Sequence, residues 1–167
     1  MKNKKALKSI VSIILLFGVF TGLFYLMVNS NEEITPVPSE QVEAALIEED
    51  FAIENQISVP KNSQYAEYAK TVSAKKDDIV ISFYEFDNDD YANAVYDEFL
   101  SEFYHSLYRP GNRIGTEGGK NYFYFVCDGN NRYYALTMWV GNTAICAYCN
   151  MGNQAPITNV LSAINYI

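Results

Sequence analysis

The sequence is poor in the residues that most often carry catalysis, with one histidine and three cysteines among 167 residues. A Ser-His-Asp triad needs a histidine as its base, and nothing near the lone His105 indicates one. Residues 115–120 are glycine-rich but lack the spacing and the following Ser or Thr of a phosphate-binding loop. The acidic turn 87–90 does not match a calcium-binding loop at the fifth and sixth positions. The sequence therefore predicts no enzyme activity, no cofactor and no metal site.

Basic side chains are also scarce, with 12 Lys and Arg against 20 Asp and Glu. Four of the lysines precede residue 9, so the chain beyond the apolar N-terminal run carries 8 basic and 20 acidic side chains, a formal charge of −12. Nucleic acids and anionic lipids would be repelled by such a domain. The charge therefore argues against nucleic-acid binding and leaves neutral or cationic partners.

The longest apolar stretch, residues 10–28, contains 19 residues and no charge. As a helix it would span about 29 Å, close to the thickness of the hydrocarbon core of a bilayer. Lysines precede it, whereas Glu32 and Glu33 follow it, which places the N-terminus in the cytoplasm. We therefore predict a basic cytoplasmic flank (1–9), a transmembrane signal anchor (10–28), a proline-containing linker (29–39) and an extracytoplasmic domain (40–167).

A cleaved signal peptide is the competing interpretation of residues 10–28. The apolar region of a signal peptide is usually about 7–15 residues long and ends at a small-residue cleavage site. The nearest candidate site, residues 28–30, directly follows a run long enough to span a membrane, which favours the anchor. The predicted localisation is the cell membrane, with a single pass, the N-terminus in the cytoplasm and the C-terminal domain outside.

The periodicity of apolar residues predicts an α+β domain. Tyr91, Val95, Phe99 and Phe103 recur at fourfold spacing, as on one face of a helix. Predicted helices cover about 40–51, 89–108 and 156–165, and predicted strands cover 65–73, 78–86, 122–127, 133–140 and 143–150, with a glycine-rich loop at 112–121. The predicted fold is thus an N-terminal transmembrane helix followed by a mainly antiparallel sheet of about five strands and three helices, in the order α-β-β-α-β-β-β-α.

Two stretches of the chain carry a resemblance to a known group of proteins. Residues 77–99, DDIVISFYEFDNDDYANAVYDEF, join an aromatic strand to an acidic helix start, and GKNYFYF follows at 119–125. In these stretches the chain resembles small membrane-anchored or lipoprotein extracytoplasmic domains of unknown function from Gram-positive bacteria. The resemblance covers residues 40–167 and implies an architecture and a compartment but no activity. The chain departs from the lipoprotein members because its first cysteine is Cys127.

Cys146 and Cys149 form a C-x-x-C pair, which is the one candidate for redox chemistry. Redox pairs of this kind place the first thiolate at a helix N-terminus, which lowers its pKa. Here the pair lies in a predicted strand, where side chains alternate between faces, so the two thiols point apart. Buried, unreactive thiols are the favoured interpretation, and a thiol-dependent redox protein is the alternative.

Both faces of the three predicted strands over 122–150 are apolar. An antiparallel sheet usually has one solvated face, so either helices cover both faces or one face is an aromatic surface for a partner. We predict a non-catalytic binding or protein-interaction module that contacts another membrane or envelope protein through this face or a free strand edge. A carrier of hydrophobic ligands is a further alternative. The candidate aromatic face consists of Phe123, Phe125, Tyr133, Trp139 and Tyr148.

Overall fold

A computed structural model describes residues 32–54, 63–106, 113–128 and 132–167. The predicted membrane-spanning stretch 10–28 lies outside these residues. Among the residues that the structure describes, no helix is both long and apolar enough to cross a membrane. The chain from Glu33 to Ile167 forms one structural unit.

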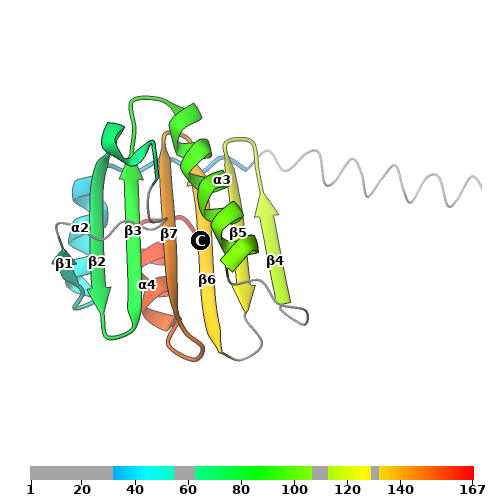
Figure 1. Ribbon diagram of the computed structural model, residues 1–167. Coiled ribbons are helices and arrows are strands. Elements are labelled where there is room, and N and C mark those ends of the chain that lie inside the picture. Colours follow the sequence, from blue (N-terminus) through cyan, green and yellow to red (C-terminus); the bar gives the residue numbers. More distant parts are fainter. Residues whose placement is uncertain (1–31, 55–62, 107–112, 129–131) are drawn as a thin grey trace, which may run out of the picture. The chain divides into compact units, whose positions relative to one another are not determined.

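The centre of this unit is a seven-stranded sheet in which every neighbouring pair of strands is antiparallel (Figure 1). The order across the sheet is β1-β2-β3-β7-β6-β5-β4, so β7 inserts between β3 and β6 and joins the two halves of the chain. The strands are β1 (Ala52–Glu54), β2 (Lys70–Lys76), β3 (Ile79–Glu85), β4 (Arg113–Gly118), β5 (Tyr122–Asp128), β6 (Tyr133–Val140) and β7 (Thr143–Asn150).

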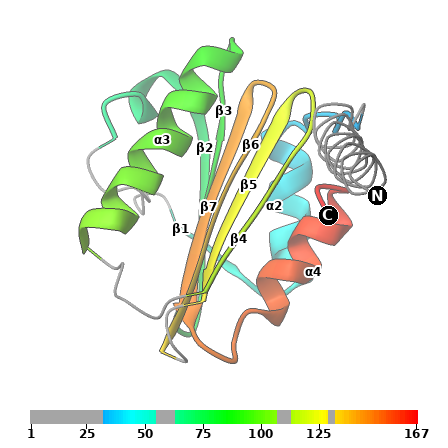
Figure 2. The same cartoon turned by 90° about the vertical axis from the view of Figure 1, so that its right-hand side faces the viewer.

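Helices cover both faces of the sheet. Helix α3 (Asp89–Ser106) lies across one face, whereas α2 (Ser39–Glu48) and α4 (Ala155–Ala163) lie on the other (Figure 2). A short 3-10 helix, η1 (Ala66–Tyr68), precedes β2. This arrangement explains why the central strands are apolar on both sides, since neither face of the sheet centre meets water.

The predicted fold class is wrong in the number and order of its strands. The structure has seven strands, and the two that were missed are β1, directly after α2, and β4, inside the predicted glycine-rich loop 112–121. The strand predicted at 65–73 begins at Lys70 instead, because residues 66–68 form η1. Glycine is depleted in strands, so the sequence of β4, RIGTEG, has no strand signal and the strand forms through its pairing with β5.

The two faces of the sheet hold separate hydrophobic cores. The α2–α4 core is centred on large buried side chains such as Leu46, Ile81, Phe83, Leu136 and Leu161. The α3 core lies on the opposite face and contains Tyr84, Phe99, Phe103, Phe125 and Cys146. At roughly 1.5–3 kcal/mol for each large apolar side chain, burial in these two cores is the main stabilising contribution to the fold.

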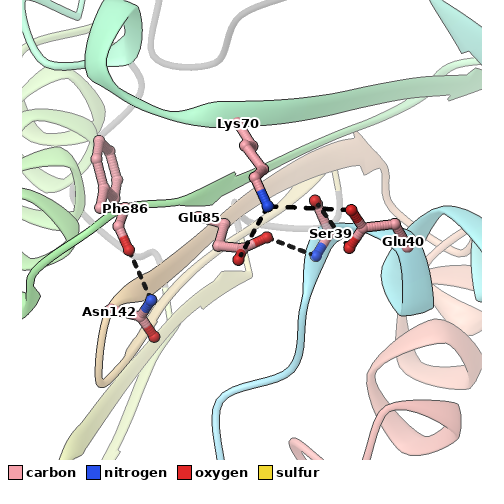
Figure 3. Close-up of polar contacts among 6 residues, drawn as sticks. All are labelled: Ser39, Glu40, Lys70, Glu85, Phe86 and Asn142. Atoms are coloured by element: carbon pink, nitrogen blue, oxygen red, sulfur yellow. Dashed lines mark hydrogen bonds and ion pairs between the residues drawn. The ribbon is translucent and has the colours of Figure 1, made fainter.

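Polar contacts fix the start of α2 against the end of β3 (Figure 3). The residue before α2 is Pro38, which offers no side-chain cap, and the Glu85 carboxylate instead accepts the Ser39 N–H at 2.8 Å. Lys70 lies 3.6 Å from Glu85 and 4.0 Å from Glu40. Because the hydrogen bond from Ser39 favours the ionised carboxylate, the pKa of Glu85 is lowered.

Candidate binding surface beside helix α3

The five predicted aromatic side chains share the face of the sheet that α3 covers, but they do not form one exposed patch. Phe125 is buried, and Tyr133 and Trp139 are partly buried against the α3 core. Phe123 and Tyr148 remain exposed, at 38% and 37% of their surface. They belong to β5 and β7, which lie on either side of β6. The two exposed side chains are therefore separated by a strand.

The covered members of this set have structural partners. The Phe125 ring packs against Phe103 at 5.2 Å and Tyr104 at 6.2 Å between ring centroids. The Trp139 indole N–H donates to the Gly141 carbonyl at 2.7 Å. Phe125 and Trp139 therefore hold α3 and the β6–β7 turn in place, and sequence alone did not separate these roles from binding.

An exposed apolar surface remains on one side of α3, over β5 and β4. Helix α3 packs mainly on β6 and β7. The α3 core also contains Phe125 and Cys127 of β5, whereas Phe123 of β5 and Ile114 of β4 remain exposed. Tyr104 is 46% exposed, Ile114 is 42% exposed, and Leu100 is partly buried. Phe123 meets Tyr96 edge-on at 5.8 Å. We call the four residues Leu100, Tyr104, Ile114 and Phe123 the α3–β4 surface; Tyr96 itself is buried.

Among the described residues, strand β4 forms one edge of the sheet and has β5 as its single strand neighbour. Its side chains on the α3 face are small near the turn, and the ring of Phe123 lies over Gly118. A Cβ atom on Gly118 would stand 2.7 Å from Cδ2 of Phe123. The Phe123 ring can therefore occupy this position only because residue 118 is glycine. The ring thereby fills the space above Gly118 without a bulky residue on β4 itself.

Sequence reasoning missed Tyr104 and Ile114. The fourfold spacing places Phe103 on the buried face of α3, but it does not show that the adjacent Tyr104 packs against Phe125 of β5 while staying 46% exposed. Ile114 was hidden in a stretch that contains Gly111, Gly115 and Gly118. The available signal was its isolation as the one large apolar residue of β4.

The two cysteines of the C-x-x-C pair lie on opposite faces of β7. Cys146 belongs to the α3 core and Cys149 to the α2–α4 core, and both are buried free thiols; Cys127 is also buried, in the α3 core. Burial raises the pKa of Cys146 to about 12 and the pKa of Cys149 to about 11. Both thiols are therefore protonated at neutral pH, which is the opposite of what a redox pair needs.

The acidic turn before α3 serves the helix. Asn88 Oδ1 accepts the Tyr91 N–H at 3.1 Å, as an N-cap residue does, while Asp89 and Asp90 lie in the first turn. Within the described ranges, no group of three or more His, Cys, Asp or Glu side chains is placed to hold a metal ion.

The fold and the site define a small domain with an antiparallel sheet between helices and an exposed apolar surface at one edge. No family model and no curated protein matches the chain. Among solved structures, the chain is similar to the extracellular domain of PknH from Mycobacterium tuberculosis. The two are 11% identical with a TM-score of 0.36, and the match covers 83% of this chain and 100% of that one. A likeness at this level establishes no function.

Proposed function

We propose that this chain is a non-catalytic binding module that works outside the cytoplasmic membrane and contacts another protein through the α3–β4 surface. The observation that carries the proposal is an apolar surface, with Tyr104, Ile114 and Phe123 each more than a third exposed, beside an edge strand. Association with the membrane through residues 10–28 and the external compartment rest on the sequence of that segment alone.

The proposed mode of contact is the addition of a partner strand to the edge strand β4. An edge strand presents a row of backbone groups to which an extended segment of a partner can add as a further strand. Side chains of the added strand would alternate between faces, so every second one would reach the side where Ile114 and Phe123 lie. The opposite edge, β1, has three residues against six in β4, so β4 offers the longer template.

The experiment uses the full-length chain in the cells that produce it. Crosslinking followed by purification and mass spectrometry identifies proteins that lie next to it. Ile114→Asp places a charge on the α3–β4 surface, whereas Ile47→Asp places the same charge on α2, on the other side of the sheet, where Ile47 is 56% exposed.

We expect one reproducible partner that Ile114→Asp loses and Ile47→Asp retains. If both variants recover the same proteins as the unaltered chain, the α3–β4 surface is not the contact. Because each variant replaces an exposed side chain, we expect both to keep the fold. Circular dichroism of the two variants checks this.

A further inference from the structure

Three tyrosine rings gather where η1 meets the first turn of α3. Tyr91 is the central ring: Tyr68 stacks on it at 5.5 Å with 24° between the ring planes, and Tyr65 lies at 5.6 Å with 30°. The buried Phe86 supports Tyr91 edge-on at 6.0 Å. We call Tyr65, Tyr68 and Tyr91 the tyrosine stack.

The stack is more exposed than packing of the core requires. Phe86 belongs to the α3 core and Tyr65 packs against it. Tyr68, in contrast, leaves 57% of its surface in solvent, and Tyr91 leaves 36%. Two stacked rings are thus presented to solvent on a rigid base, an arrangement that suits the capture of a flat or cationic group.

The charged side chains next to the stack in the described sequence segments 63–69 and 86–91 are acidic. A hydrogen bond with the Glu67 carboxylate is the main cause that raises the pKa of Tyr68, so Glu67 lies at the hydroxyl of the outer ring. Exposed Asp87 and Asp90 adjoin Phe86 and Tyr91 in the chain. From residue 77 to residue 108 the sequence has nine Asp and Glu and no Lys or Arg.

The nearest lysine in the sequence does not neutralise this surface. Lys70, two residues after Tyr68, points to the start of α2, where it lies near Glu85 and Glu40 (Figure 3). Exposed aromatic faces beside unneutralised carboxylates attract cations through the ring quadrupole and through direct Coulomb attraction. A guanidinium group makes both kinds of interaction, because it is planar and stacks on tyrosine, and because it pairs with carboxylates.

We propose that the tyrosine stack binds arginine side chains of a basic segment of a partner protein. This site lies at the N-terminal end of α3 and shares no residue with the α3–β4 surface. The two proposals can therefore be tested independently of each other. The charge of −12 on the chain beyond residue 28 supports a cationic occupant.

The test titrates the purified full-length chain with a hexa-arginine peptide and, as the uncharged isostere, a hexa-citrulline peptide, by isothermal titration calorimetry at low and moderate salt. We expect saturable binding of hexa-arginine alone. Tyr68→Leu should weaken it roughly three- to fivefold, as expected for one exposed cation–π contact, whereas Tyr68→Phe, which keeps the ring, should bind as the unaltered chain does.

Tyr104→Leu is the matched control, because Tyr104 is an exposed tyrosine near the other end of the same helix. It should leave hexa-arginine binding unchanged, because it removes no charge and lies outside the tyrosine stack. Equal affinity for Tyr68→Leu and the unaltered chain would show attraction by net charge alone and overturn the proposal, as would equal losses in Tyr68→Leu and Tyr104→Leu. Tyr91→Leu provides a second variant of the stack, and thermal unfolding of each variant shows that the fold is retained.

Discussion

The side-chain amide of Asn121 binds both backbone groups of Ile34. Its oxygen accepts the Ile34 N–H at 3.0 Å, and its nitrogen donates to the Ile34 carbonyl at 2.8 Å. Three residues later, the Val37 N–H donates to the hydroxyl of Tyr166 at 3.2 Å, and the Val37 side chain is buried in the α2–α4 core. The segment directly before α2 is therefore held against the folded domain.

Replacing Asn121 with Asp tests this attachment. Asp keeps the shape and the acceptor for the Ile34 N–H, but it removes the donor and places a negative charge against the Ile34 carbonyl. We expect a loss of about 1–3 kcal/mol in the free energy of unfolding, as for a part-buried hydrogen bond broken on one side. Urea unfolding of the full-length chain measures it, with Asn93→Asp on the exposed side of α3 as the control. Equal losses in the two variants would contradict the assignment.

The sheet centre was predictable because its strands are runs of β-branched and aromatic residues and a tight turn sets their register. The Gly141-Asn142 turn predicts that Val140 faces Thr143 and Tyr134 faces Cys149, and both pairings are present. A turn at residues 128–132 likewise predicts that Cys127 faces Tyr133, and this prediction is wrong. Cys127 faces Ala135, because the pairing of β5 with β6 starts one residue later on both strands, at Asp128 and Tyr134.

The candidate site was less predictable, because exposure depends on where α3 lies. Alternation placed Phe123 and Phe125 on one face correctly, but it could not show that Phe103 and Tyr104 cover Phe125 while Phe123 stays more than a third exposed. A local pattern says which face a side chain is on, whereas tertiary packing decides which part of the face is covered.

Glu85 provides a pH-dependent contribution to stability. Its pKa in the folded state is lowered below the ordinary value of 4.5, chiefly by the hydrogen bond from the Ser39 N–H. A lowered folded pKa means that the stabilisation is complete above about pH 4.5 and is lost as the pH falls through the folded value. Glu85→Gln should therefore cost about 1 kcal/mol at pH 7, comparable to the loss of a helix cap, and progressively less towards pH 3. A constant difference between the two chains across urea titrations from pH 7 to pH 3 would refute this account.

The three thiols should be unreactive until the chain unfolds. Burial of Cys127, Cys146 and Cys149 blocks access, and the raised pKa of Cys146 and of Cys149 leaves almost no thiolate at pH 8. We expect Ellman's reagent to titrate all three only after guanidinium is added, at a rate limited by unfolding. Fast labelling of native Cys149, or an intact mass that shows a disulfide, would restore the redox alternative.

Phe123 and Phe125 lie on the same strand and the same face, and therefore form a matched pair. Phe125→Ala should lower the free energy of unfolding by about 3–5 kcal/mol, because the side chain is buried against Phe103 and leaves a cavity. Phe123→Ala should cost only about 1 kcal/mol, since more than a third of the ring is already in solvent. Similar losses in denaturant unfolding would show that α3 does not cover the sheet as described. Binding experiments should therefore alter Phe123 and avoid Phe125.

Alanine substitutions at Gly118 and Gly115 distinguish an effect on the α3–β4 surface from an effect on the stability of β4. An added Cβ on Gly118 would stand 2.7 Å from the Phe123 ring, so the ring must turn away from Tyr96. On Gly115 the added Cβ meets a Val126 methyl carbon at 3.0 Å instead. Both alanines suit a strand at least as well as glycine, so neither should unfold the domain. We expect Gly118→Ala to reduce recovery of the crosslinked partner and Gly115→Ala to leave it intact, because only the former displaces Phe123. The reverse order would place the contact on the other face of the sheet.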